Sequence, residues 1–171
     1  NVAMDAACSA IRAGASEVVV LYRRGEEEMP AWKREQEFAK EEGVKFRYLT
    51  APRKFIEKDG KVAVIECVST RLGEPDSSGR PRPEVIPGSE HVIDVSYVIL
   101  ATGQAPWPEA SQVFGGIELS PSGTFKVAPE TLATSLEGVF AGGDAVNGGR
   151  TVVQAVADGK LAAKSINDFL S

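Results

Sequence analysis

The chain is poor in the residues from which metal and redox centres are usually built. Its 171 residues contain one histidine, His91, and two cysteines, Cys8 and Cys67. Because neither cysteine belongs to a C-x-x-C pair or lies near a histidine cluster, a zinc, Fe–S or dithiol centre built from this chain alone is excluded. We expect two buried thiols in a reducing cytoplasm, and a structural role for His91 at the start of a strand.

An excess of positive charge and long apolar runs are also missing. The 19 basic and 24 acidic residues give a net charge of -5, which argues against a surface for nucleic acid or anionic membranes. No apolar run approaches the roughly 20 residues of a membrane-spanning helix. The hydrophobic fraction of 43% is ordinary for a globular protein.

The first 24 residues carry the most informative pattern. Apolar residues recur with helical spacing from Met4 to Ile11, Gly14 can end that helix, and a β-branched strand follows at 18–20. Two arginines, Arg23 and Arg24, come after the strand. This order is the second half of a βαβ dinucleotide-binding unit whose first strand and glycine-rich loop we expect upstream.

The charged residues of this stretch predict the coenzyme. A helix that begins at Asn1 and Val2 would direct its free amides and positive dipole end at a pyrophosphate. Arg23 and Arg24 suit a 2′-phosphate, so NADP is favoured over NAD. Replacing both with alanine should raise the KM for NADPH much more than that for NADH. The alternative is an ordinary helix and strand followed by solvated arginines.

The middle of the chain changes its pattern. A second helix over 31–42 and an alternating strand over 44–49 extend the parallel sheet. Asp59-Gly60 then predicts a tight hairpin turn, because this pair tolerates the positive φ angles that such turns need. We expect an exposed loop over 73–90 and a strand over 91–96, which together with the hairpin make an antiparallel meander.

The last third contains two strands that end in small residues. The apolar run at 97–101 ends at Thr102-Gly103, and an expected strand at 139–141 leads into Gly142-Gly143-Asp144. A glycine at a strand end lets the backbone approach a ligand closely, and an aspartate there can accept hydrogen bonds from hydroxyl groups. A brief strand is expected at 125–127 and a long helix at 151–170.

Several of these stretches resemble one known family. NVAMDAA, RAGASEVVVLYRR and EEMPA look like the NADPH-binding domain of the glutamate synthase small (beta) subunit and its relatives. GVFAGGDAVNGGRTVVQAVADGKLAAKSI is similar to the carboxyl-terminal FAD motif of the same family. The resemblance implies an α/β fold with an incomplete Rossmann-like NADPH-binding domain at 1–103, made of a parallel sheet and an antiparallel meander. The C-terminal segment of a discontinuous FAD-binding domain follows at 104–171.

The resemblance also implies roles for individual residues. Thr102 and Gly103 fall in the family's ATG motif, where the chain returns from the NADPH domain to the FAD domain. Gly143 would let the backbone approach the FAD pyrophosphate, and Asp144 would bind a ribityl hydroxyl. The helix start at Thr151, Val152 and Val153 would face the pyrimidine edge of the isoalloxazine and stabilise negative charge there.

The implied activity is that of a cytoplasmic NADPH-dependent flavoprotein oxidoreductase. Hydride would pass from NADPH to FAD, and electrons would leave through Fe–S clusters elsewhere in the complex to a large subunit or a ferredoxin-type acceptor. No catalytic side chain or metal ligand is required in this segment. Two alternatives remain: a bifurcating NADPH-ferredoxin oxidoreductase subunit, and a non-catalytic nucleotide-binding or interaction module.

We further expect the chain to be a piece of a longer protein and to be inactive alone. Strands that lack their neighbours should leave apolar surface exposed, so the isolated chain should self-associate or be flexible. Size-exclusion chromatography with light scattering tests this expectation, and a rigid, well-behaved monomer would count against it.

Overall fold

The computed structural model describes residues 1–76 and 79–171 and divides the chain into two compact units, Asn1–Thr102 and Gly103–Ser171. Ser77 and Ser78, which belong to the loop expected at 73–90, lie outside the described residues. Among the described residues, no helix combines the length and apolar character needed to cross a membrane.

The first unit begins with two helices and a parallel pair of strands. In chain order these are α1 (Val2–Arg12), β1 (Val19–Leu21), α2 (Lys33–Glu41) and β2 (Lys45–Arg47). β1 and β2 pair in parallel with Val20 opposite Phe46, as the sequence predicts. Gly14 follows α1 with a φ of 96°, a value that favours glycine and ends the helix.

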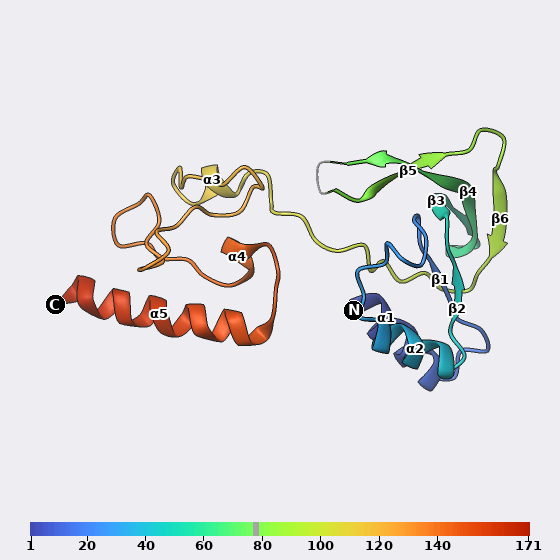
Figure 1. Cartoon of the computed structure of the whole chain (residues 1–171), viewed down its shortest axis with the longest axis horizontal. Helices are drawn as coiled ribbons and strands as arrows, with labels where there is room; N and C mark the ends of the chain where they lie inside the picture. The colour runs from blue at the N-terminus through green and yellow to red at the C-terminus, as the bar shows by residue number, and fades with distance from the viewer. Residues whose placement is uncertain (77–78) are drawn as a thin grey trace. The chain divides into compact units, whose positions relative to one another are not determined.

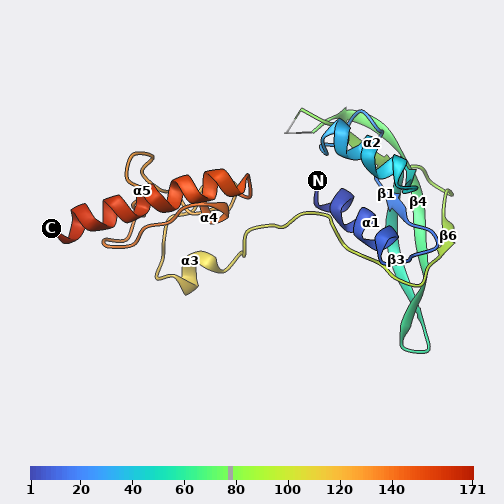
Figure 2. The same cartoon turned by 90° about the horizontal axis from the view of Figure 1, so that it is seen from below.

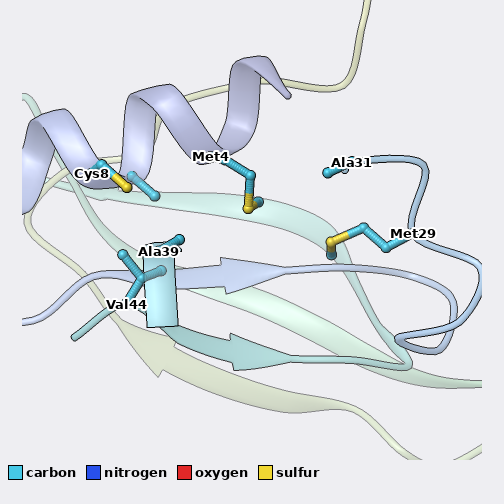
Figure 3. Close-up of a cluster of buried hydrophobic side chains, with 7 residues drawn as sticks. Met4, Cys8, Met29, Ala31, Ala39 and Val44 are labelled. Carbon is cyan, nitrogen blue, oxygen red and sulfur yellow. The ribbon is translucent and has the colours of Figure 1, made fainter. Parts of the chain in front are cut away.

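Small and flexible apolar side chains form the core of this part. Met4, Ala7 and Cys8 of α1 are buried with Ala39 of α2 and Val44. The loop before α2 adds two more buried side chains, Met29 and Ala31. Figure 3 shows Met4 and Cys8 on the side of α1 that faces this cluster. The loop before α2 is therefore a packed part of the unit.

An antiparallel meander follows, with β3 (Thr50–Lys58), β4 (Lys61–Pro75), β5 (Pro81–Val85) and β6 (His91–Asp94). The long strand β4 pairs with β3 along one edge, and β5 and β6 share its other edge (Figures 1 and 2). Asp59 and Gly60 have φ angles of 55° and 77°, which confirms the predicted hairpin turn. His91 Nδ1 lies 3.0 Å from the Ser89 carbonyl oxygen, as a structural histidine would.

The prediction of an exposed loop over 73–90 is wrong in part. The end of β4 and the whole of β5 fall within it, with Leu72 opposite Pro83 and Pro75 opposite Pro81. Proline cannot donate to a ladder of hydrogen bonds, which is why the sequence pattern indicates a loop. An edge strand such as β5 tolerates proline because one side of it needs no donors.

The strand expected at 97–101 is also absent from the described fold. These residues belong to no strand, and Tyr97, Ile99 and Leu100 are 89%, 63% and 69% exposed. An apolar run forms a strand only when a neighbour accepts its hydrogen bonds, and the described chain supplies none here. The apolar side chains of this segment are thus open to solvent.

The second unit contains mostly loops and one long helix, α5 (Val152–Leu170), with the short helices α3 (Ala110–Val113) and α4 (Asp144–Asn147) (Figure 1). The strands expected at 125–127 and 139–141 shrink to isolated bridges, Leu119 with Phe125 and Ala133 with Phe140. Phe140 makes an edge-on contact with Phe169 of α5, the ring centroids lying 6.1 Å apart. This contact joins the loops of the unit to its long helix.

Candidate functional site

The first group of predicted residues lies at the carboxyl end of β1. The Arg23 side chain is exposed, as a ligand-binding cation would be. Arg24 is buried, with 4% of its surface exposed, and forms an ion pair with Asp76 over 2.8 Å. The structure therefore gives these adjacent arginines different surroundings.

The start of α1 belongs to the same unit and is exposed. Asn1 precedes the helix, and Val2 in its first turn is 72% exposed. The Asn1 side-chain oxygen accepts a hydrogen bond from the Trp32 N–H at 3.1 Å. In the middle of the same loop, the Tyr22 hydroxyl donates to the Glu28 carbonyl at 2.8 Å. The loop over 25–32 thus connects the end of β1 to the start of α1.

Thr102 and Gly103 lie where one unit ends and the other begins. Both are exposed, and Gly103 has a φ of 89°, a backbone conformation that favours glycine. In the part of the chain that the structure describes, no hydrogen bond or ion pair joins either residue to the other predicted site residues. Their role stays a prediction.

The second group forms around the Gly142-Gly143-Asp144 turn. Gly143 has φ 62° and ψ −144°, a region that only glycine adopts without strain. Gly142 packs so closely on α5 that an added Cβ would lie 2.8 Å from the Cβ of Asp158. The turn requires glycine at both positions for local reasons.

Asp158 of α5 holds this turn in place. Its carboxylate accepts hydrogen bonds from the Gly143 N–H at 2.9 Å and from the Gln154 side chain at 2.8 Å. The bond from Gln154, followed by that from Gly143, lowers the pKa of the Asp158 carboxyl. The Gly143 amide is therefore occupied within the unit, which the sequence did not predict.

Asp144, Thr151 and Val152 come together at one open pocket of about 450 Å³, together with Arg150, Ala155 and Val156. Thr151 caps α5 by accepting from the Gln154 N–H at 3.2 Å, and the Ala155 N–H donates to the Thr151 carbonyl. Among the described residues, no partner is found for the amides of Val152 and Val153. Their side chains are 81% and 79% exposed.

This set of groups combines acceptors and donors in one concave site. The Asp144 carboxylate can accept hydrogen bonds from hydroxyl groups, and the free amides and positive end of α5 can face an electron-rich ring edge. Arg150 adds a cation to the same pocket. The groups present therefore fit a polyhydroxylated ligand that carries an electron-rich ring.

The sequence did not indicate that three further residues, Trp32, Arg150 and Asp158, contact or line the predicted sites. Arg150 carried a usable signal, since it directly precedes the Thr151 cap of the predicted helix. Asp158 carried none, because its bond to Gly143 spans 15 residues and depends on how α5 packs.

The two cysteines behave as expected of buried thiols. Both are free and buried, and burial is the largest cause of the raised pKa of each. A raised pKa lowers the thiolate fraction and hence the reactivity of the thiol. In the described residues, no group of histidine, cysteine or acidic side chains is arranged to hold a metal ion.

The two units and the groups that they expose can be compared with proteins of known family. The sequence model of the pyridine nucleotide-disulphide oxidoreductases matches residues 1–159, and the chain belongs to this family. Over 98% of its length it superposes on T. acidophilum thioredoxin reductase with a TM-score of 0.75 at 20% sequence identity, covering 49% of that chain. This likeness confirms the predicted fold class.

The curated relatives confirm the resemblance seen in the sequence. The chain is 49% identical over 99% of its length to the beta subunit of the NADP(+)-dependent formate dehydrogenase of Moorella thermoacetica, covering 24% of that protein. It is 45% identical over 99% of its length to the glutamate synthase [NADPH] small chain of Halomonas elongata, covering 36% of it. It therefore spans about a quarter to a third of the length of these two relatives.

Proposed function

We propose that the chain is part of an NADPH-dependent flavoprotein oxidoreductase. Residues 1–103 would belong to the NADPH-binding domain and residues 104–171 to the FAD-binding domain. Support comes from the family, from relatives whose names specify NADP(+) or NADPH, and from a division into compact units near the same point in the chain. Two free cysteines, both buried, support a cytoplasmic setting.

The coenzyme half of the proposal is supported by the exposed cation at the end of β1. Arg23 presents a planar fork of donors that can bind a 2′-phosphate through two hydrogen bonds. The amides of the first turn of α1, next to Asn1 and Val2, would face the pyrophosphate. The loop over 25–32 is bonded to Tyr22 at its middle and to Asn1 at its end, and would help to keep these two contacts at a fixed separation.

One observation carries the flavin half: Asp144 and the start of α5 line the same pocket. Asp144 would accept hydrogen bonds from the ribityl chain. The amides of Val152 and Val153 would donate to the pyrimidine edge, and the positive end of α5 would favour negative charge there. When bound, the two cofactors supply hydride transfer from nicotinamide to flavin, and the residues of this chain bind and orient them.

For the path of the electrons we favour exit through Fe–S clusters elsewhere in the complex to a partner subunit. The relatives named beta subunit and small chain support a partner, and glutamate synthase-like chemistry is our leading case. The relative at 49% identity is a subunit of an NADP(+)-dependent formate dehydrogenase. It supports a second candidate, in which the same domains exchange electrons with a dehydrogenase subunit instead of a glutamate synthase large subunit.

Replacing Asp144 with alanine tests the flavin site. In the full-length product, we expect Asp144→Ala to weaken FAD binding roughly 10- to 100-fold, the effect of losing hydrogen bonds to a charged acceptor. Glu130→Ala removes an exposed carboxylate from the same unit and should leave binding unchanged. Equal affinities for FAD in Asp144→Ala, Glu130→Ala and the parent would contradict the proposed site.

A further inference from the structure

Arg24 joins the end of β1 to the hairpin formed by β4 and β5. It donates through Nε to the Pro81 carbonyl at 2.7 Å and through Nη2 to Asp76 Oδ2 at 2.8 Å. Asp76 follows β4 and Pro81 begins β5, so both acceptors belong to this hairpin. The two bonds engage two different nitrogen atoms of the guanidinium group, and 4% of the side-chain surface is exposed.

The backbone at the two arginines is held by β4 and by the segment between β2 and β3. The Thr70 hydroxyl of β4 donates to the Arg23 carbonyl at 2.8 Å, and the Leu49 N–H donates to the Arg24 carbonyl at 3.0 Å. Both arginines lie in the bend that follows β1. The Arg24 side chain is anchored in the hairpin, whereas the Arg23 side chain is exposed to solvent.

In these surroundings Arg24 is poorly suited to bind a phosphate. Its charge is balanced at contact distance by Asp76, whose side chain is only 25% exposed. A phosphate that took Arg24 would have to displace its hydrogen bonds to the Asp76 carboxylate and the Pro81 carbonyl, and breaking such bonds at a buried side chain is costly. Arginine suits the observed contacts because one rigid fork reaches a carbonyl and a carboxylate together.

We infer that the two arginines have different roles in coenzyme selection: Arg23 binds the 2′-phosphate, and Arg24 is a positioning residue. Arg24 fixes the β4–β5 hairpin against the end of β1 and so sets the direction of Arg23. This inference rests on the proposed NADPH function. It makes the meander a structural support of the coenzyme site.

The thermal stability of the chain tests the positioning role without any coenzyme. Arg24→Lys keeps the charge but cannot satisfy both acceptors, and it should lower the Tm by about 5 °C, as expected for the loss of roughly one good hydrogen bond. Asp76→Asn should lower the Tm similarly, and the double variant should melt within about 2 °C of the single variants because both break one contact. Arg23→Gln should leave the Tm unchanged.

Ligand preference separates the two arginines. The probes are 2′,5′-ADP, which carries the 2′-phosphate, and 5′-AMP, which does not, with dissociation constants measured by calorimetry. Arg23→Gln should reduce the preference for 2′,5′-ADP about tenfold or more. Arg24→Lys should reduce the preference only partly, by about threefold, because Arg23 still contacts the 2′-phosphate but is less firmly directed toward it.

Asp76→Asn gives the sharpest distinction. If Arg24 were a phosphate ligand restrained by Asp76, this variant would release it and raise the preference for 2′,5′-ADP above that of Glu74→Gln, which removes an equal charge from a nearby exposed side chain. Such a rise, or an Arg24→Lys variant with unchanged Tm, overturns the positioning role. A full-length product that binds 2′,5′-ADP no better than 5′-AMP would instead contradict the proposed NADPH function.

Discussion

Gly142 and Gly143 are adjacent, but each meets a different physical demand. Gly143 adopts a positive φ with an extended ψ, which side chains resist. Gly142 has no positive φ, but its neighbour Asp158 occupies the space that a Cβ would need. A glycine next to a nucleotide site invites an explanation by ligand contact, but at Gly142 the packing of α5 is sufficient.

Gly142→Ala should therefore destabilise the second unit. The added Cβ must displace α5 or the turn, and overpacking of this kind costs about 1–3 kcal/mol. Gly159→Ala is the matched control. It lies within α5 with open space around it, so alanine should stabilise the unit by up to about 1 kcal/mol through its helix propensity. Urea unfolding measures both, and two changes of the same sign would contradict the packing account.

Asp158 makes the same turn sensitive to pH. Its pKa is lowered in the folded state, so the stabilisation that it gives is present above the pKa of the unfolded chain, about 4. That stabilisation is lost as the pH falls through the lower folded value. The Tm of the parent should therefore drop between about pH 4 and pH 2 by more than that of Asp158→Asn, whose amide does not titrate. Parallel Tm profiles for the two proteins would exclude this role.

At the scale of elements, α1 is held by side chains more than by its caps. Asn1 makes no side-chain cap for the helix, since its oxygen accepts from Trp32 in the loop before α2. Met4, Ala7 and Cys8 are instead buried against Ala39 and Val44. The position of the helix start, where a pyrophosphate would lie, thus depends on the core beneath it (Figure 3).

Met4→Ala tests this dependence. Met4 is 2% exposed, and truncating a buried methionine costs about 2–5 kcal/mol through lost apolar contact and the cavity left behind. Ser9→Ala, on the exposed side of the same helix, should change the stability by less than about 0.5 kcal/mol. Chemical unfolding of the first unit gives both values, and similar losses in the two variants would show that α1 is not anchored by this core.

For the molecule as a whole, the elements with strong local signals were predictable from the sequence. Helical spacing gave α1, α2 and α5 within a few residues, and Asp59-Gly60 located the β3–β4 hairpin. The prediction failed where pairing decides the outcome. The apolar residues 97–101 have no strand beside them in the described fold, while the proline-containing β5 forms because β4 offers it an edge.

The candidate site was predictable to a similar extent. Local sequence located Arg23 after its strand and Asp144 after its turn, but burial cannot be read from a pair of adjacent arginines. Arg24 is buried because residues 52 and 57 positions further along the chain supply its acceptors. Self-association of the isolated chain stays a prediction, with Tyr97, Leu100 and Val152 among the large apolar side chains exposed.

The central claim is that these residues belong to an enzyme that passes electrons from NADPH to a flavin. The most direct test is the anaerobic visible spectrum of the full-length product after desalting, recorded during matched titrations with NADPH and NADH. We expect a retained flavin band that bleaches with NADPH at far lower concentrations than with NADH. A product that retains no flavin after incubation with FAD, or whose flavin band responds equally to both coenzymes, would contradict the account.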